Sequence, residues 1–313
     1  MQRIFRKAGG ILALLLLAVP LVAQQGPINN RAVAILRWYP ANLTSYYTVG
    51  QRPYQIVFDG TNIWVTNFDS DTVTKLRTSD EKVLGNFTTG NFPTGVVFDG
   101  ANIWVADWGA ATITELRASD GTTLGTFGTG NRPFGLVFDG SNIWVANNAD
   151  NTVTKLRASD GTNLGTFPVG HGPYFEAFDG ADIWVANNID GTVTELRASD
   201  GTILGTFPVG SSPLGVAFDG ANIWVAGGAG VSKLRASDGT LLGTFSTGPS
   251  PSGLAWDGAN MWVANSGNGT ITKLRGSDGF LQGIFPLPGT QPIGVAFDSV
   301  NIWVADSGGV SKK

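Results

Sequence analysis

Short apolar runs of strand length alternate with turn residues along most of the chain. In one representative stretch these runs cover residues 95–98, 103–105, 112–117 and 124–127. The third run, TITELR, alternates apolar and polar positions, which is the period of a half-buried strand. Asp-Gly pairs separate the first run from the second and the third from the fourth. Because glycine accepts a positive φ and aspartate tolerates one, Asp-Gly between strand-like runs predicts tight hairpins. Each stretch therefore predicts four antiparallel strands.

This four-strand unit recurs along the chain. Its centre, Asn-Ile-Trp-Val, recurs with little change, and its tryptophan stands at positions 64, 104, 144, 184, 224, 262 and 303. Four strands in about 40 residues are typical of one blade of a β-propeller. A solenoid, the alternative repeat architecture, favours one strand face per 20–30 residues and atypical units at both ends. The spacing therefore favours a propeller with seven blades.

The two ends of the chain are partial units that complement each other. Residues 32–50 align without gaps to residues 192–210, the third and fourth strands of a unit, whereas residues 292–305 supply a first and a second strand. Pairing them closes the ring and leaves no open sheet edge. We predict an all-β, seven-bladed propeller of four-stranded antiparallel blades, the last closed by both termini. Residues 32–37 and the stub 310–312 both fit the third strand there, and we expect the N-terminal copy, because the stub is short.

The first 23 residues are typical of a secretory signal peptide. Three basic residues precede the purely apolar run 11–19, and Ala23 is a suitable cleavage point. The apolar stretch 8–23 is shorter than the roughly 20 residues of a spanning helix, so an uncleaved membrane anchor is the weaker alternative. We expect a secreted or periplasmic protein without a membrane span after signal removal. Residues 24–31 then form a short linker, and residues 32–313 a single propeller domain.

Charge and cysteine content exclude several classes of function. The formal net charge is −4, and removal of residues 1–23 would make it −7. An acidic protein repels phosphate backbones, so nucleic-acid binding is not expected. The chain has no cysteine, which excludes disulfides, thiolate metal sites and cysteine nucleophiles. About 290 residues suffice for a core held by packing alone, and we expect a monomer.

The runs NIWVAN, NTVTKLR and LGTFPVG resemble YVTN-type and NHL-type propeller repeats, and they are similar to the repeats of streptogramin (virginiamycin B) lyases. The resemblance covers residues 32–313 and implies a ligand-binding top face, formed by the blade-to-blade loops and the loops between second and third strands. For lyase activity, the resemblance implies a histidine pair, a glutamate and a magnesium ion, but this chain has only one histidine. Lactonase-type propellers imply calcium bound by Asp, Asn and Glu, and YVTN proteins imply a structural role at the cell surface.

Residues present in every unit are interpreted as structural. The seven tryptophans are expected in the core between blades, and the aspartates of the Asp-Gly turns are explained by turn chemistry. A ring of mostly polar residues follows the second strand of each unit. Strand-end capping explains it, although calcium binding at the channel stays open as an alternative. The ring comprises Asn67, Asp107, Asn147, Asn187, Gly227, Asn265 and Asp306.

Residues that occur in only one unit are the candidates for function. Glu176 replaces Ile, Val or Leu on the innermost strand, where a carboxylate needs a partner or a raised pKa. We expect it near His171 at the channel mouth, with charge supplied by Arg52, Arg132 or His171; water or a cation in the channel is the alternative. Neutral drift in exposed loops is the alternative for any single residue. The candidate ligand-binding residues are Arg52, Tyr54, Gln55, Phe92, Trp108, Arg132, His171, Tyr174, Phe175 and Glu176.

Aromatic rings beside hydrogen-bonding groups suit sugars, small cyclic ligands or peptide segments. We therefore expect a binding or interaction scaffold whose top face, over blades one to four, takes a small molecule, a glycan or a protein partner. The alternative is a lyase-like or lactonase-like enzyme with calcium or magnesium at the channel mouth. No Gly-x-Ser-x-Gly motif, metal-type histidine spacing or phosphate loop occurs. We assign no catalytic residue. Calcium or magnesium is expected only under the enzyme alternative, and no other cofactor is expected.

Overall fold

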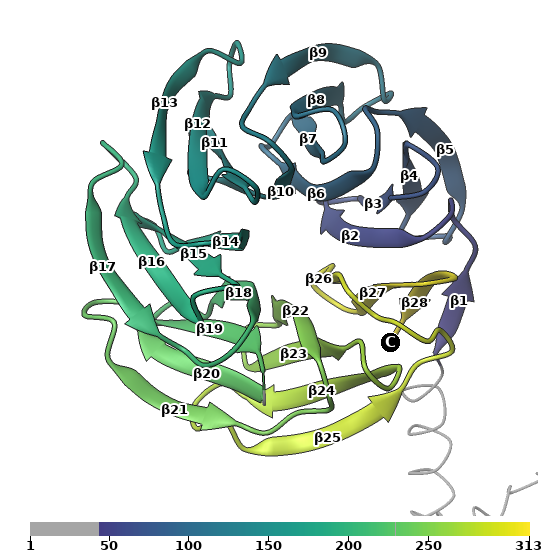
Figure 1. Ribbon diagram of the computed structural model, residues 1–313. Helices are drawn as coiled ribbons and strands as arrows, with labels where there is room; N and C mark the ends of the chain where they lie inside the picture. The colour runs from purple at the N-terminus through teal and green to yellow at the C-terminus, as the bar shows by residue number, and fades with distance from the viewer. Residues whose placement is uncertain (1–43, 229) are drawn as a thin grey trace, which may run out of the picture. The chain divides into compact units, whose positions relative to one another are not determined.

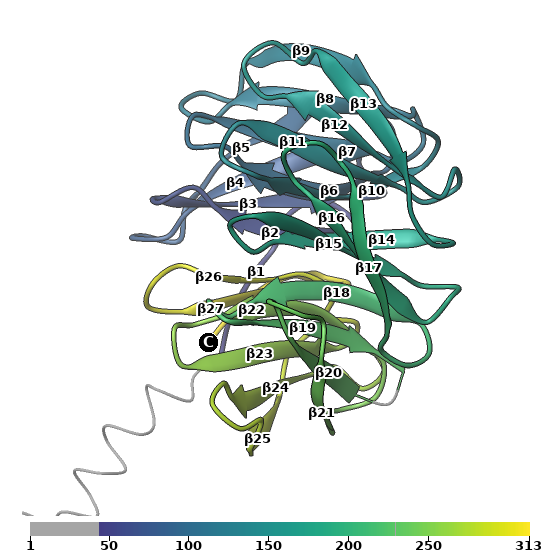
Figure 2. The same cartoon turned by 90° about the vertical axis from the view of Figure 1, so that its left-hand side faces the viewer.

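The computed structural model describes residues 44–228 and 230–313. In this part of the chain, seven four-stranded antiparallel sheets stand around a central channel. Figure 1 shows the first strand of every sheet next to the channel and the fourth at the circumference, and Figure 2 views the ring from its edge. The predicted seven-bladed propeller is confirmed. No helix among the described residues has the length and apolar character needed to cross a bilayer.

Six blades are continuous in sequence, and each follows the order inner strand, two central strands, outer strand. The strands of blades 1 to 3 are β2 (Pro53–Phe58), β3 (Asn62–Asn67), β4 (Thr72–Arg77), β5 (Val83–Thr88), β6 (Pro93–Phe98), β7 (Asn102–Asp107), β8 (Thr112–Arg117), β9 (Thr123–Gly128), β10 (Pro133–Phe138), β11 (Asn142–Asn147), β12 (Thr152–Arg157) and β13 (Asn163–Pro168). Those of blades 4 to 6 are β14 (Pro173–Phe178), β15 (Asp182–Asn187), β16 (Thr192–Arg197), β17 (Ile203–Pro208), β18 (Pro213–Phe218), β19 (Asn222–Gly227), β20 (Gly230–Arg235), β21 (Leu241–Phe245), β22 (Pro251–Trp256), β23 (Asn260–Asn265), β24 (Thr270–Arg275) and β25 (Leu281–Pro286).

The seventh blade is built from both ends of the chain. Its order from channel to circumference is β26 (Val295–Phe297), β27 (Ile302–Asp306), β28 (Gly309–Lys312) and β1 (Ser45–Tyr47). Closure by both termini is therefore confirmed, but the expectation that residues 32–37 supply the third strand is wrong. That place belongs to the C-terminal stub, because β28 follows β27 after a two-residue turn and pairs with it locally. Closing a short hairpin costs less entropy than recruiting a distant segment. Residues 32–37 themselves lie outside the described part of the chain.

The repeated tryptophans and aspartates have one structural role. In each blade the tryptophan indole N–H donates to the aspartate of the preceding turn, as from Trp144 to Asp139 at 2.8 Å. The other oxygen of Asp139 accepts backbone N–H groups within its own turn. Trp144 is fully buried and packs against Ile183 and Val185 of the next blade. The expectations of inter-blade packing and turn chemistry are confirmed.

Members of the polar ring after the second strands make hydrogen bonds within the fold. Asn147 is fully buried, accepts the Gly130 N–H through Oδ1 at 3.0 Å, and donates to the hydroxyls of Thr152 and Thr154. Asp107 takes the same place in blade 2 with equivalent partners. These bonds tie the start of a blade to its second and third strands. Strand-end capping thus accounts for Asn147 and Asp107, whereas the Oδ1 atoms of Asn67, Asn187 and Asn265 are buried without a hydrogen-bond partner among the described residues.

Glycine recurs on the inner strands because neighbouring blades approach closely there. A Cβ atom on Gly95 would collide with the carbonyl oxygen of Phe134, and one on Gly253 would collide with that of Ile293. Five of the seven inner strands keep glycine at this place, whereas blades 1 and 4 carry Gln55 and Phe175. These two exceptions determine the shape of the channel.

Candidate functional site

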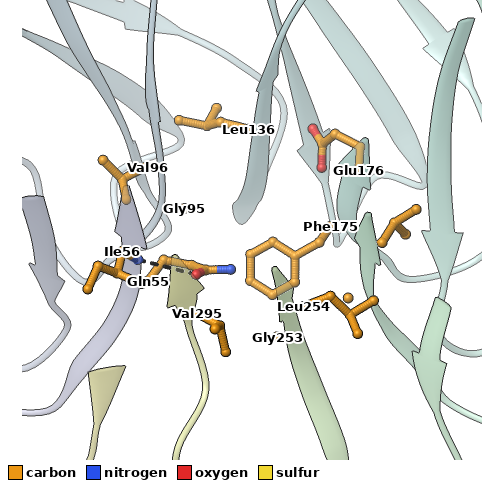
Figure 3. A pocket seen from close by; sticks show the side chains of 12 residues that line it. Gln55, Ile56, Gly95, Val96, Leu136, Phe175, Glu176, Gly253, Leu254 and Val295 are labelled. Carbon is orange, nitrogen blue, oxygen red and sulfur yellow. Dashed lines mark hydrogen bonds between the residues drawn. The ribbon is translucent and has the colours of Figure 1, made fainter. Parts of the chain in front are cut away.

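Gln55 and Phe175 project into the channel from β2 and β14. Figure 3 shows the Gln55 amide and the Phe175 ring pointing toward each other across the channel. The amide oxygen of Gln55 accepts the N–H of Ile56 at 3.2 Å, and its own backbone N–H donates to the Thr66 hydroxyl at 2.9 Å. Thr66 replaces the alanine found at this place in the other blades. The two residues therefore narrow a channel that glycine would leave open.

Phe175 lines two cavities. The channel cavity, of about 120 Å³, lies among the inner strands and includes Gln55 and Glu176 in its wall. The mouth cavity, of about 270 Å³, opens on the top face, where the loops between blades meet the loops between second and third strands. The mouth cavity is lined by Tyr54, Tyr174, Phe175, Leu214, Ser252, Ser266, Gln291 and Ile293.

Glu176 occupies the wall position that is aliphatic in the other blades. Its Oε1 atom accepts the Ala146 N–H of blade 3 at 3.1 Å, whereas its Oε2 atom is buried and has no hydrogen-bond partner among the described residues. Burial raises the pKa of this carboxyl well above its ordinary value, and the Ala146 N–H opposes that shift only in part. The neutral acid is therefore favoured over a wider pH range than in water.

None of the expected charged partners contacts this carboxyl. Arg52 lies 3.6 Å from Asp69 and stacks over Phe68, and Arg132 stacks over Trp108 at 4.9 Å. His171 is exposed on the rim and places Nδ1 2.9 Å from Asp190. The expectation that one of these cations compensates Glu176 is therefore wrong. The backbone of the preceding blade supplies the contact instead, because Ala146 on β11 lies within hydrogen-bond distance of Glu176 on β14, whereas the three cationic side chains contact other residues.

Aromatic residues of blades 1 to 4 that blades 5 to 7 lack form one continuous ridge. Successive ring centroids lie 4.2–6.1 Å apart, close enough for direct packing. Tyr54 connects the two halves of the ridge, since it contacts Phe68 at 5.8 Å and Phe134 at 5.6 Å. The aromatic ridge consists of Trp108, Phe92, Phe68, Tyr54, Phe134 and Tyr174.

Backbone strain occurs at Phe92 of this ridge and at the two arginines that stack on it. Arg52, Phe92 and Arg132 adopt φ values of 52°, 56° and 53°, where blade 4 has Gly172. A non-glycine residue in the left-handed region costs about 1–2 kcal/mol. Ser212 and Ser250 adopt the same conformation in blades 5 and 6, so the strain belongs to the loop type. Large side chains have been kept there in blades 1 to 3 despite that cost.

The structure divides the ten candidate residues into three groups. Tyr54, Gln55, Tyr174, Phe175 and Glu176 line the cavities. Phe92, Trp108 and the two arginines lie together outside the mouth cavity, and His171 is apart on the rim of blade 4.

The mouth cavity also includes residues of blades 5 to 7 that sequence analysis did not select. These are Leu214, Ser252, Ser266, Gln291 and Ile293. The residue after the inner-strand proline differs from blade to blade, and that variation was the available signal for Leu214, Ser252 and Ile293. It was hard to recognise because small and aliphatic residues are ordinary in loops. The cavity faces blades 1 and 4 to 7, rather than blades 1 to 4.

The lining of the mouth cavity carries no charge. Its polar groups are two phenols, two hydroxyls and one amide. Burial raises the pKa of Tyr54 and of Tyr174, so both phenols are neutral and able to donate hydrogen bonds at physiological pH. Apolar walls with a few neutral donors and acceptors suit an uncharged ligand.

Comparison with known proteins identifies the fold but no close relative. No family profile matches the chain, and no curated protein is detectably similar to it in sequence. Similar structures include a chain of hydrazine synthase from Kuenenia stuttgartiensis, with a TM-score of 0.76 and 16% identity over 86% of this chain and 97% of that one. A streptogramin B lyase follows with a TM-score of 0.75 and 17% identity over 86% and 96%. A catalytically inactive virginiamycin B lyase from Staphylococcus aureus with quinupristin has a TM-score of 0.75 and 18% identity over 86% and 98%. The chain is thus a seven-bladed propeller similar in fold to virginiamycin B lyase.

Proposed function

We propose that this protein is a binding propeller that holds a small neutral, ring-shaped ligand, such as the terminal sugar of a glycan, in the mouth cavity. The observation that carries the proposal is the cavity of about 270 Å³ with its uncharged lining. Ligand sites for drug-sized molecules span about 300–1,000 Å³, so this cavity suits a single ring.

Three further features support binding at this place. Tyr174 and Phe175 both depart from the repeat and both line the cavity. Phe175 lines both the mouth cavity and the channel cavity, so its ring lies between them. A propeller of similar fold, the inactive virginiamycin B lyase, is known with quinupristin. We propose binding rather than lysis, since one histidine cannot provide the pair that the lyase resemblance implies.

The proposal is tested by calorimetric titration with methyl glucoside and methyl glucuronide, two rings of one shape that differ by a carboxylate. We expect saturable binding of the neutral ring only, because the lining offers no cation to a carboxylate. Leu214→Trp should abolish binding by filling the cavity. The fold should accept that change, because blades 1, 3 and 4 carry Tyr54, Phe134 and Tyr174 at the equivalent place.

Ile189→Ala is the matched control. Ile189 belongs to the same face, is 75% exposed and does not line the mouth cavity, so its truncation should leave binding unchanged. Equal binding by wild type and Leu214→Trp, or equal binding of the two probes, would refute the assignment of the ligand to this cavity.

We further propose that the propeller works as a monomer outside the cytoplasm after removal of residues 1–23. The signal-like pattern supports export, and residues 1–23 lie outside the described part of the chain. Mass spectrometry of the protein from its native host, combined with size-exclusion chromatography, tests both points. A chain that still starts at Met1, or one that elutes as a dimer, would contradict them.

A further inference from the structure

The position that faces the tryptophan on the third strand carries a lysine in five blades. Lys75 of blade 1 donates through Nζ to the carbonyl oxygens of Ala118 and Ser119 in blade 2, at 2.6 and 3.1 Å. Lys155 repeats these bonds from blade 3 to Ala198 and Ser199 of blade 4. The turn carbonyls of one blade thus hold a cation that the preceding blade provides.

An aspartate completes this cation environment in blade 5. The Lys233 Nζ atom donates to the carbonyl of Gly276 at 2.6 Å and lies 3.6 Å from Oδ2 of Asp219. Both side chains are almost fully buried, at 7% and 6% exposure. Carboxylate and carbonyl oxygens therefore surround a positive charge at the junction between two blades.

Blade 2 replaces the lysine by a glutamate and compensates the change locally. Glu115 is buried, and its Oε1 atom accepts a hydrogen bond from the Asn102 amide at 2.7 Å. Asn102 is the asparagine of the Asn-Ile-Trp-Val sequence. A neutral donor thus takes over part of the role of the missing ammonium.

Blade 4 has the glutamate without the compensation. Glu195 is 8% exposed and has no hydrogen-bond partner among the described residues, because Asp182 replaces the asparagine of the other blades. In the strand register Asp182 and Glu195 take the places of Asn102 and Glu115, whose side chains are in contact in blade 2. Arg197 pairs in register with Asp182 but directs its guanidinium to Asp200, at 3.2 Å.

A cation from solution can replace the lysine ammonium that blade 4 lacks. We infer that the junction of blades 4 and 5 is a Ca²⁺ site, formed by the carboxylates of Glu195 and Asp182 and by turn carbonyls of blade 5. The Ala236 N–H bonds to the Ala221 carbonyl as the Ala198 N–H bonds to the Ala181 carbonyl. Ala236 and Ser237 are therefore the blade 5 equivalents of Ala198 and Ser199, whose carbonyls hold Lys155.

The donor set determines the choice of metal. Carboxylate and carbonyl oxygens without nitrogen or sulfur suit a hard cation, and Ca²⁺ accepts irregular geometry and water ligands better than Mg²⁺. No three carboxylates converge on a single point among residues 44–228 and 230–313, so main-chain oxygens and water complete the coordination. This site is independent of the mouth cavity and of the ligand proposed there.

Terbium luminescence provides the test, because Tb³⁺ replaces Ca²⁺ and is excited by a nearby indole. Trp184 stands opposite Glu195 in the strand register. We expect the purified protein to sensitise one equivalent of Tb³⁺ through its tryptophans, and Ca²⁺ to displace it more effectively than Mg²⁺. Glu195→Lys, which restores the residue of the neighbouring blades, should remove the signal, and Asp182→Asn should weaken Ca²⁺ binding about tenfold or more.

Glu115→Lys is the matched control, since it makes the same change in blade 2 and should leave the luminescence intact. A folded Glu195→Lys protein that still binds Tb³⁺ as wild type does, or a wild-type protein without a Ca²⁺-displaceable signal, would overturn the inference. Thermal melting of each variant without metal establishes that it is folded.

Discussion

Tyr47 packs against Trp303 with ring centroids 5.7 Å apart, so two residues from opposite ends of the chain make the contact that closes the ring. Each of the other six blades makes the same contact within itself, between its tryptophan and a phenylalanine of its outer strand, as Trp184 and Phe207 do at 5.6 Å. Tyr47 is paired through β1 with β28, with Tyr47 opposite Val310. The N-terminal strand therefore replaces the outer strand that the C-terminal end lacks.

Deletion of residues 24–50 should lower the melting temperature, because it removes β1 and exposes the edge of β28. Tyr47→Ala should cause a smaller decrease, since it removes the ring contact but keeps the strand. Differential scanning calorimetry of the three proteins measures the order. An unchanged melting temperature in the deletion variant would contradict closure by the N-terminal strand.

Trp144→Ala should lower the free energy of unfolding by about 3–5 kcal/mol, as expected for a large buried aromatic residue. Trp144 is fully buried and donates to Asp139. Trp108→Ala should cost much less, because Trp108 is half-buried on the top face and no other blade has a tryptophan there. Denaturant titration compares the two variants. Equal losses would argue against the distinction between core and surface tryptophans.

Asp107→Asn should stabilise the protein above about pH 6. Burial raises the pKa of Asp107 from 3.8 to about 6, so the folded state retains a proton that the unfolded chain loses. The contribution of Asp107 to the free energy of unfolding therefore decreases by about 2–3 kcal/mol as pH rises from about 4 to 6. It stays at that lower value above pH 6. Asparagine removes this dependence and keeps the partners that Asn147 has in blade 3.

The reciprocal variant is the control for this prediction. Asn147→Asp introduces the same carboxyl in blade 3 and should destabilise the protein above pH 6 while having little effect at pH 4. Unfolding measured by urea at both pH values distinguishes the outcomes. Relative to wild type, the free energy of unfolding should rise with pH in Asp107→Asn and fall with pH in Asn147→Asp. If the two variants do not show these opposite trends, Asp107 is not the titrating group.

Glu176→Gln should raise the free energy of unfolding at pH 8 by about 1 kcal/mol or more, because an amide keeps the oxygen that accepts the Ala146 N–H and cannot ionise. Burial raises the pKa of Glu176 above 4.5, so its cost appears as pH rises from that value and should vanish at pH 4.

Glu81 provides a comparison of opposite sign. Its ion pair with Lys312 lowers its pKa, so its contribution to stability is present at neutral pH and is lost in acid. Glu81→Gln should therefore destabilise the protein at pH 7. Stability curves of both variants between pH 4 and 8 test the pair, and a destabilised Glu176→Gln protein at pH 8 would show that the carboxylate is needed there.

The repeat made the copies controls for one another, which is why the residues of the blade core could be assigned from sequence. Trp144 and Asp139 recur because each blade needs the same packing and the same turn. Departures from the repeat identified Tyr174, Phe175 and Glu176 correctly as unusual, and these residues do line the cavities. The departures from the repeat did not indicate which groups these side chains contact. Glu176 contacts the backbone of blade 3 rather than His171, since that depends on how closely two blades approach.

Local physics in the sequence determined the blade: strand periods, Asp-Gly turns and a tryptophan in every unit specify four antiparallel strands without reference to distant residues. Tertiary packing decided the rest. It placed β28 rather than residues 32–37 in the third-strand position and directed His171 to Asp190. It also brought Leu214, Ser252 and Ile293 to the mouth cavity beside Tyr174. These outcomes depend on distances between segments far apart in the chain, and such distances exist only once the ring has closed.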